Sequence, residues 1–169
     1  VGTYVKGVND LEVKNAISGV AIDKNQAKVA IIEVPDKPGM AANLFTAIAD
    51  KGYIVDMIIQ SVRESETNDI AFTVTKDDLD SVTVICKEIA KEIGAKDVVI
   101  DDKVAKVSIV GAGMVGRAGV AASMFKALGD SNINIHMIST SEIKISCIVD
   151  LSECEEAARI IHNRLISEN

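Results

Sequence analysis

The stretch that decides the fold is GMAANLFTAIADKGYIVDMIIQS, from Gly39 to Ser61, because the chain contains it twice. A second copy, GVAASMFKALGDSNINIHMISTS, runs from Gly119 to Ser141, and the two copies agree at 9 of 23 positions. An apolar run precedes each copy, KVAII beginning at Lys28 and KVSIV beginning at Lys106. A repeat of this length indicates two structural units of the same kind.

Each copy predicts the same order of elements, strand-helix-strand-strand-helix. The strands come from β-branched runs, and the helices from apolar residues at helical spacing. A helix is expected after the first and after the third strand of each copy. The predicted strands are Val29–Val34, Ile54–Ile59 and Ile70–Thr75 in the first copy, and Val107–Val110, Ile133–Ser139 and Ile143–Val149 in the second.

A ferredoxin-like unit needs one more strand than each copy supplies. The first copy finds this strand in Ala95–Asp101, but the second copy ends without one. The strand-like segment Asn15–Asp23 has no role in the first unit, so we expect it to complete the sheet of the second. The predicted fold class is therefore α+β, two ferredoxin-like βαββαβ units with the first inserted into the second. The predicted boundaries are 24–101 for the first domain, 14–23 plus 102–169 for the second, and 1–13 for an N-terminal tail or linker.

Composition excludes several classes of function. The formal net charge is −7 and no Lys/Arg cluster occurs, so we expect no nucleic-acid partner. Aromatic residues make up only 3% of the chain, too few for base-stacking platforms. No apolar run approaches the roughly 20 residues of a membrane span, and no signal peptide is seen, so no membrane partner is expected.

Cysteine usage indicates a reducing compartment. Cys86, Cys147 and Cys154 are an odd number and show no C-x-x-C spacing, which predicts free thiols and a cytoplasmic location. The sequence has no metal-spaced His/Cys set, no P-loop and no catalytic-triad signature. We therefore expect no metal and no cofactor, and we expect this chain alone to be non-catalytic.

One motif favours a different function. VSIVGAGMVGRAG, beginning at Val107, contains G-x-G-x-x-G in Gly111, Gly113 and Gly116, the fingerprint of a dinucleotide-binding turn. That fold needs an acidic residue about 20 residues later, at the end of the next strand, and the matching strand NINIHMIST is followed by no Asp or Glu until Glu142. The corresponding stretch of the first copy, VAIIEVPDKPG, lacks the fingerprint. The glycines are better explained as a lengthened strand-to-helix loop, and dinucleotide binding stays an unfavoured alternative.

The paired units and the D-K-P-G turn resemble tandem ACT domains, and more narrowly the regulatory region of aspartokinase. The matching segments are ISGVAIDKNQAKV, PDKPGMAANLF, IVDMIIQS, DDKVAKVSIVGAGM, GVAASMFKAL and NINIHMISTSEIKIS. The resemblance implies an amino-acid sensor for feedback inhibition that takes lysine, threonine or both. It also implies a catalytic kinase domain or alpha subunit that carries the phosphotransfer from ATP to aspartate. The small size of the two units and their open sheet edges predict a homodimer, which would form through the ACT domains. Such a chain is either a separate regulatory subunit or a cut fragment.

A free amino acid needs donors for its carboxylate and acceptors for its ammonium. The amides of Gly39, Met40 and Ala41 follow the turn at Asp36, Lys37 and Pro38 and would face an anion at a helix start. Asp36 and Asp56 are candidates for the ammonium, and Gln60 offers both a donor and an acceptor. The same turn sequence also fits a plain helix start with no ligand. The complete set of expected effector-binding residues is Asp36, Lys37, Pro38, Gly39, Met40, Ala41, Ile54, Val55, Asp56, Gln60, Val120, Ala121, Asn134, Ile135, Ser141 and Glu142, those from Val120 onward implied by the resemblance alone.

Two questions stay open at this point. Asp36, Asp56 and Glu142 could serve the side chain of lysine, whereas Gln60 and Asn134 could serve threonine, and the sequence does not choose between them. A ligand-independent ACT dimerisation module is the alternative from a different class of function. His136 shares a strand face with Asn134, and we interpret it as a surface or interface histidine without a catalytic role.

Overall fold

The structure is a computed structural model that describes residues 17–62, 66–115 and 119–167. The chain divides into two compact units, which we call the continuous unit, Lys24–Ala105, and the split unit, Val1–Asp23 with Lys106–Asn169. The predicted tail at 1–13 lies outside the described residues. The domain boundaries predicted above stay predictions. We propose that the chain divides in this way because the first unit is inserted into the second.

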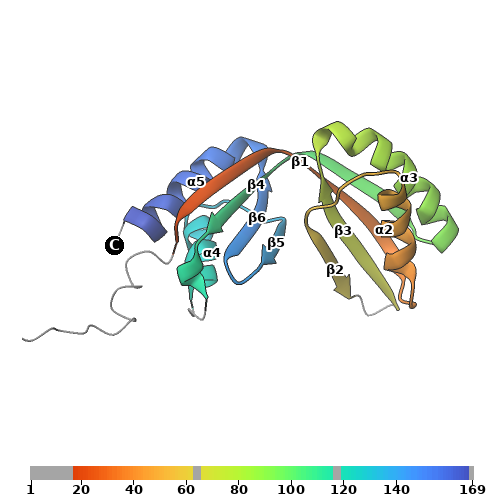
Figure 1. The fold of residues 1–169 in the computed structure, drawn as a ribbon, viewed down its shortest axis with the longest axis horizontal. Coiled ribbons are helices and arrows are strands. Elements are labelled where there is room, and N and C mark those ends of the chain that lie inside the picture. The colour runs from red at the N-terminus through yellow and green to blue at the C-terminus, as the bar shows by residue number, and fades with distance from the viewer. Residues whose placement is uncertain (1–16, 63–65, 116–118, 168–169) are drawn as a thin grey trace, which may run out of the picture. The chain divides into compact units, whose positions relative to one another are not determined.

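The continuous unit is a four-stranded sheet with two helices. Its strand order is β2-β3-β1-β4, and β3 pairs antiparallel with both β1 and β2. Helices α2 and α3 pack together (Figure 1). The elements are β1 Gly19–Pro35, α2 Met40–Asp50, β2 Ile58–Val62, β3 Thr67–Val74, a 3₁₀ turn Lys76–Asp78, α3 Leu79–Ile93 and β4 Asp97–Val110.

One side of this sheet forms the core of the continuous unit. Alternate residues of β3, among them Ile70 and Phe72, are buried together with Leu44 and Ile48 of α2. The Phe72 ring meets the Phe45 ring edge-on, with the ring centres 5.4 Å apart and the planes at 73°. Strands alternate their side chains between two faces, so the period-two burial shows which face carries the helices.

The split unit repeats this arrangement. Its strand order is β1-β4-β6-β5, and β5 pairs antiparallel with β6. Helices α4 and α5 pack against each other, with Met124, Leu128, Ala127, Ala157 and Ile161 buried on them. The further elements are a 3₁₀ turn Ala112–Met114, α4 Val120–Asp130, β5 Met137–Thr140, β6 Lys144–Asp150, a 3₁₀ turn Leu151–Glu153, α5 Cys154–His162 and a π-helical turn Asn163–Ser167.

The predicted fold class of two ferredoxin-like α+β units is confirmed by this element order. The antiparallel pairings of β1 with β3 and of β5 with β6 argue against the dinucleotide alternative, because a dinucleotide fold has a mostly parallel sheet. Gly111 and Gly113 do lie in a strand-to-helix connection, between β4 and α4. Gly116, which completes the fingerprint, lies outside the described residues.

Two predicted strand boundaries are wrong in the same way. The strands predicted at 54–59 and 133–139 begin at Ile58 and Met137, so their first residues precede the strand. In the first case the chain still follows β3 irregularly, because the Asp56 N–H donates to the Thr73 carbonyl and the Thr73 N–H to that of Met57, both at 3.0 Å. The apolar residues before these strands therefore predict neither regular pairing nor uniform burial, since Met57 is buried but Ile54 is 77% exposed.

Two pairs of predicted strands are in fact single long strands. Gly19–Pro35 joins the segments predicted at 15–23 and 29–34, and Asp97–Val110 joins those at 95–101 and 107–110. No glycine or proline interrupts either junction, so nothing stops the strand there. Opposite charges on β1 and β4 lie within ion-pair distance at the junctions, in the pairs Lys28–Asp101 and Lys106–Asp23, at 3.9 and 3.6 Å.

No helix within the described part of the chain combines the length and the apolar character that a membrane crossing requires.

The three cysteines are buried free thiols. Burial raises the pKa of Cys86 and of Cys147 from the ordinary 9.0 to about 12, because a thiolate loses its hydration there. We therefore expect a thiol-specific disulfide reagent to leave the folded chain unmodified at pH 8 and to modify all three cysteines in denaturant. The free energy of unfolding should also fall as the pH rises from 9 towards 12, since the unfolded thiols ionise first. Rapid modification of the folded chain would contradict this burial.

Candidate functional site

The turn before α2 sets the geometry of the first candidate site. Gly39 precedes the helix at φ +95°, a left-handed conformation that disfavours any residue with a Cβ, although no atom lies within 4 Å of where a Cβ would be. The Asn43 N–H donates to the Gly39 carbonyl at 2.9 Å and starts the helix. The Met40 N–H donates back to the Lys37 carbonyl at 3.4 Å, a long hydrogen bond.

A cavity of about 100 Å³ lies at this helix start, within the continuous unit. Six of the residues predicted from the sequence line it, and Gln60 reaches it from β2, where it stands opposite Ile70 of β3. The lining also includes residues that the sequence analysis missed. The full lining is Val34, Pro35, Asp36, Lys37, Gly39, Met40, Ala41, Gln60, Asn68 and Ile70.

Asn68 is the most informative of the missed residues. It is only 3% exposed, and its Nδ2 donates to the Asp36 Oδ1 at 2.8 Å. Its Oδ1 is buried without a hydrogen-bond partner among the described residues. A buried acceptor left unpaired is costly, so this oxygen can stabilise a bound donor. An Asn inside an alternating strand, TNDIAFTV, is the sequence signal that could have found it.

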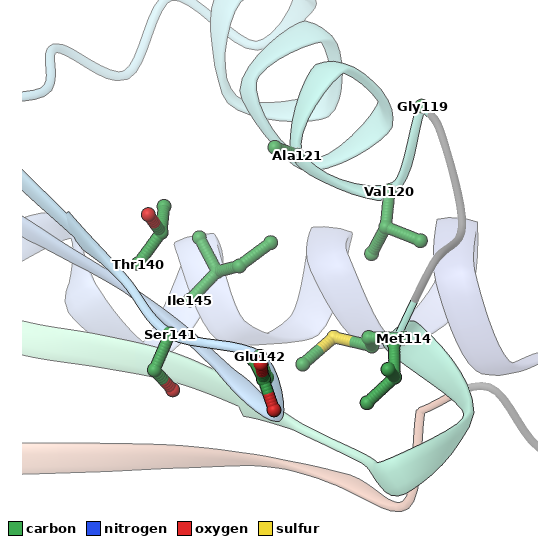
Figure 2. Close-up of a pocket in the computed structure, with 9 residues that line it drawn as sticks. Met114, Gly119, Val120, Ala121, Thr140, Ser141, Glu142 and Ile145 are labelled. Atoms are coloured by element: carbon green, nitrogen blue, oxygen red, sulfur yellow. The ribbon is translucent and has the colours of Figure 1, made fainter.

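The split unit has a larger cavity, of about 370 Å³, at the corresponding place (Figure 2). Val120 and Ala121 reach it from the start of α4, and Ser141 and Glu142 from the turn between β5 and β6. Gly119, at φ +92°, repeats the conformation of Gly39 before the helix. Four of the predicted residues therefore line this cavity, together with Met114, Val115, Gly119, Thr140 and Ile145, which the sequence analysis did not identify.

The two cavities differ in charge. Asp36 and Lys37 bring one carboxylate and one ammonium to the cavity of the continuous unit. Glu142 is the charged residue among those lining the cavity of the split unit, at the tip of the β5–β6 turn in Figure 2. The Ser141 N–H donates to the Lys144 carbonyl at 2.7 Å and closes that turn. Both cavities can accept a cationic group, and the first also offers a cation for an anionic group.

Six predicted residues line neither cavity, and their role in binding stays a prediction. Ile54 is 77% exposed before β2, and Asp56 is exposed beside it. Asn134 is exposed before β5 and Ile135 is half-buried. The six are Pro38, Ile54, Val55, Asp56, Asn134 and Ile135.

His136 has a structural partner. Its Nε2 lies 2.8 Å from the Asp150 Oδ1, and its backbone N–H donates to the Ile148 carbonyl at 2.8 Å. The side chain thus joins the segment before β5 to the end of β6. Among the described residues no group of three or more His, Cys, Asp or Glu side chains is arranged to hold a metal ion.

Comparison with known proteins identifies the family. The ACT domain model matches residues 28–94, and a second ACT domain model matches residues 107–165. An aspartate kinase of Pseudomonas fluorescens is 48% identical over 146 residues, which is 86% of this chain and 35% of that protein. The chain therefore spans about a third of the length of this curated relative.

Two solved structures match over nearly their whole length. A chain in the crystal structure of aspartokinase alpha and beta subunits is 46% identical, with a TM-score of 0.84, covering 88% of this chain and 98% of that one. The ligand-free regulatory subunit of aspartate kinase from Thermus thermophilus is 40% identical, with a TM-score of 0.82, covering 89% and 99%. With two matched ACT domains and these relatives, the chain belongs to the aspartokinase family and corresponds to its regulatory ACT portion.

Proposed function

We propose that this chain senses a free amino acid, lysine or threonine or both, and uses it to inhibit an aspartate kinase. The observation that carries the proposal is the cavity at the start of α2, where a helix N-terminus, a carboxylate and an unpaired buried amide oxygen come together. Those three groups complement the two charged groups that every free α-amino acid has.

The helix start supplies the partner for the carboxylate. The first N–H groups of a helix have no carbonyl in a preceding turn, and the helix dipole attracts an anion there. In α2 these groups include the N–H of Ala41, a residue that lines the cavity. Gly39 has no side chain, so a ligand can approach the backbone closely there. The Lys37 ammonium at the same cavity adds to the attraction for a carboxylate.

The strand side supplies the partners for the ammonium. Asp36 carries the negative charge, and Asn68 Oδ1 is an acceptor without a partner. Charge-assisted hydrogen bonds of this kind are roughly twice as strong as neutral ones. Gln60 stands near enough to line the same cavity and can bond either a hydroxyl or an ammonium of the ligand side chain. We therefore propose that Gln60 contributes to the selectivity between lysine and threonine, because it would contact the ligand side chain.

Partners follow from the proposed role. We propose that a kinase domain or alpha subunit receives the signal, and that this chain itself carries no phosphotransfer chemistry and works in the cytoplasm. We also propose a homodimer. Strands β2 and β5 stand at the two ends of the strand order, and Ile58 and Ile138 on them are 53% and 40% exposed. Open strand edges with apolar side chains favour pairing with another copy.

Titration calorimetry of the chain tests the sensing role. We expect heat of binding with L-lysine, with L-threonine, or with the second only after the first is present. Nα-acetyl derivatives of both amino acids, which lack the α-ammonium group, should give none because Asp36 and Asn68 then lose their proposed partner. Sedimentation with and without ligand separates sensing from the ligand-independent dimerisation module. A folded chain that binds neither amino acid, alone or together, would leave only that module.

A further inference from the structure

Glu33 in β1 has a backbone conformation that its side chain disfavours. Its φ is +53°, in the left-handed region, although it is not glycine. Side chains with a Cβ are strained in this region, so surrounding contacts must hold the residue there. The strand around it is otherwise extended.

The unusual residue is part of a β-bulge. Ile31 stands opposite Ile70, and Val34 stands opposite Asn68, so β1 uses three steps where β3 uses two. Burial shows the same shift, because the buried apolar residues of β1 are Ala27, Val29 and Ile31 and then Val34. One extra residue in a strand moves every later side chain to the other face.

Two neighbouring side chains hold the bulge. The Glu33 N–H donates to Asp69 Oδ1 at 2.9 Å, a charge-assisted hydrogen bond from β3. On the other side the Lys96 Nζ lies 2.7 Å from Glu33 Oε1, and the Lys96 N–H donates to the Ile32 carbonyl at 2.9 Å. Asp69 is half-buried, so water competes less for this bond than at an exposed site.

The bulge determines where the candidate site lies. Past it, Pro35 stands opposite Thr67, and the Asp36 N–H donates to the Glu66 carbonyl at 2.9 Å. In this register Asn68 Nδ2 reaches Asp36 Oδ1 at 2.8 Å. A strand without the bulge would turn Asp36 to the opposite face, and the pair of polar groups at the cavity would be lost.

We propose that Asp69 is a positioning residue for the amino-acid site, acting through the Glu33 bulge without touching the ligand. This inference rests on the proposed function, because its binding experiment assumes that the chain binds a free amino acid. Asp69 is not among the residues that line the cavity, which separates it from Asp36 and Asn68. Its carboxylate offsets the strain at Glu33 and so keeps the binding-competent register populated.

The test is calorimetry of the full chain with L-lysine and L-threonine. Asp69→Ala should raise the Kd about tenfold, because a ligand binds more weakly in proportion to the lost competent population. Asp69→Asn keeps an oxygen acceptor of the same shape without the charge, and should raise the Kd only about threefold on the same basis. If Asp69→Ala does not fold, Asp69→Asn decides.

Glu33→Gly provides the rescue that distinguishes positioning from general stability. Glycine adopts a positive φ without strain, so the bulge should then persist without Asp69. We expect Asp69→Ala combined with Glu33→Gly, and likewise Asp69→Asn combined with Glu33→Gly, to bind as Glu33→Gly alone. Asp101→Ala is the matched control, because its carboxylate also accepts a backbone N–H, that of Lys103, yet it does not line the cavity.

Backbone amide chemical shifts give a readout that needs no ligand. The amide signals of Asp36, Lys37 and residues 39–41 should move in Asp69→Ala and return in the double variant. Wild-type affinity in Asp69→Ala, or loss of affinity that Glu33→Gly does not restore, overturns the proposal. If the wild type binds neither amino acid, the proposed function fails, and the amide shifts alone then decide whether Asp69 positions the loop.

Discussion

Phe72→Ala is expected to lower the free energy of unfolding by about 3–5 kcal/mol, the usual cost of a large-to-small change in a well-packed core. Phe72 is fully buried in the middle of β3 and also loses its edge-on contact with Phe45. Small domains have a total stability of about 5–15 kcal/mol, so this loss removes a large part of it. Urea unfolding followed by circular dichroism measures the effect, since the chain has no Trp.

Two further variants serve as controls for Phe72→Ala. Phe72→Leu keeps most of the volume and should cost less than about 1.5 kcal/mol, which preserves a folded variant for comparison. Val84→Ala, at a position 58% exposed on α3, should stay within about 0.5 kcal/mol of the wild type. A Phe72→Ala variant as stable as Val84→Ala would mean that the core described here is not formed in solution.

Asp36→Asn is expected to raise the Kd of the bound amino acid about hundredfold, which corresponds to about 2.7 kcal/mol. The change removes the negative charge that we propose as the partner of the ligand ammonium, while an amide oxygen can still accept the hydrogen bond from Asn68. The fold should therefore be preserved and the loss should be confined to binding. Calorimetry with L-lysine and L-threonine measures the Kd, and thermal unfolding without ligand verifies that stability is unchanged.

Asp50→Asn is the matched control for this change. Asp50 is exposed at the last position of the same helix, about 15 Å from the cavity. The substitution has the same chemistry and the same effect on net charge, so it should leave the Kd unchanged. Equal effects at the two positions would assign the loss to overall charge and would argue against Asp36 as the ammonium partner. Asp56→Asn in the same series tests the second acidic residue predicted from the sequence.

The fold class of the two units could be predicted from the sequence because the same order of elements occurs in both copies of the repeat. Gly39 and Gly119 stand at the same place in both copies, and both precede a helix at positive φ as the repeat implies. The buried face of each helix could be predicted because apolar residues recur there at helical spacing. The ends of strands are less well predicted, since the apolar pattern at 54–57 continues into a segment that precedes β2, where Met57 is buried but Ile54 is exposed.

The bulge and the interior Asn explain why only part of the candidate site was predicted. Apolar residues Ile31 and Ile32 are adjacent, so the pattern does not reveal which of them faces the core. The answer depends on Asp69 and Lys96, which are distant in sequence and meet Glu33 only in the folded unit. The role of Asn68 could not be predicted for the same reason, because only the strand register after the bulge brings Asp36 within hydrogen-bond distance of it.

The division of the chain has a consequence for the order of folding during synthesis. The continuous unit has all its residues as soon as the ribosome has passed Ala105, whereas Gly19–Asp23 must wait for the second segment of the split unit, which begins at Lys106. Chains fold from the N-terminal side as they emerge, and contacts between distant segments cost more loop entropy than local ones. We therefore expect the amino-acid cavity at α2 to exist on the nascent chain before the split unit is complete.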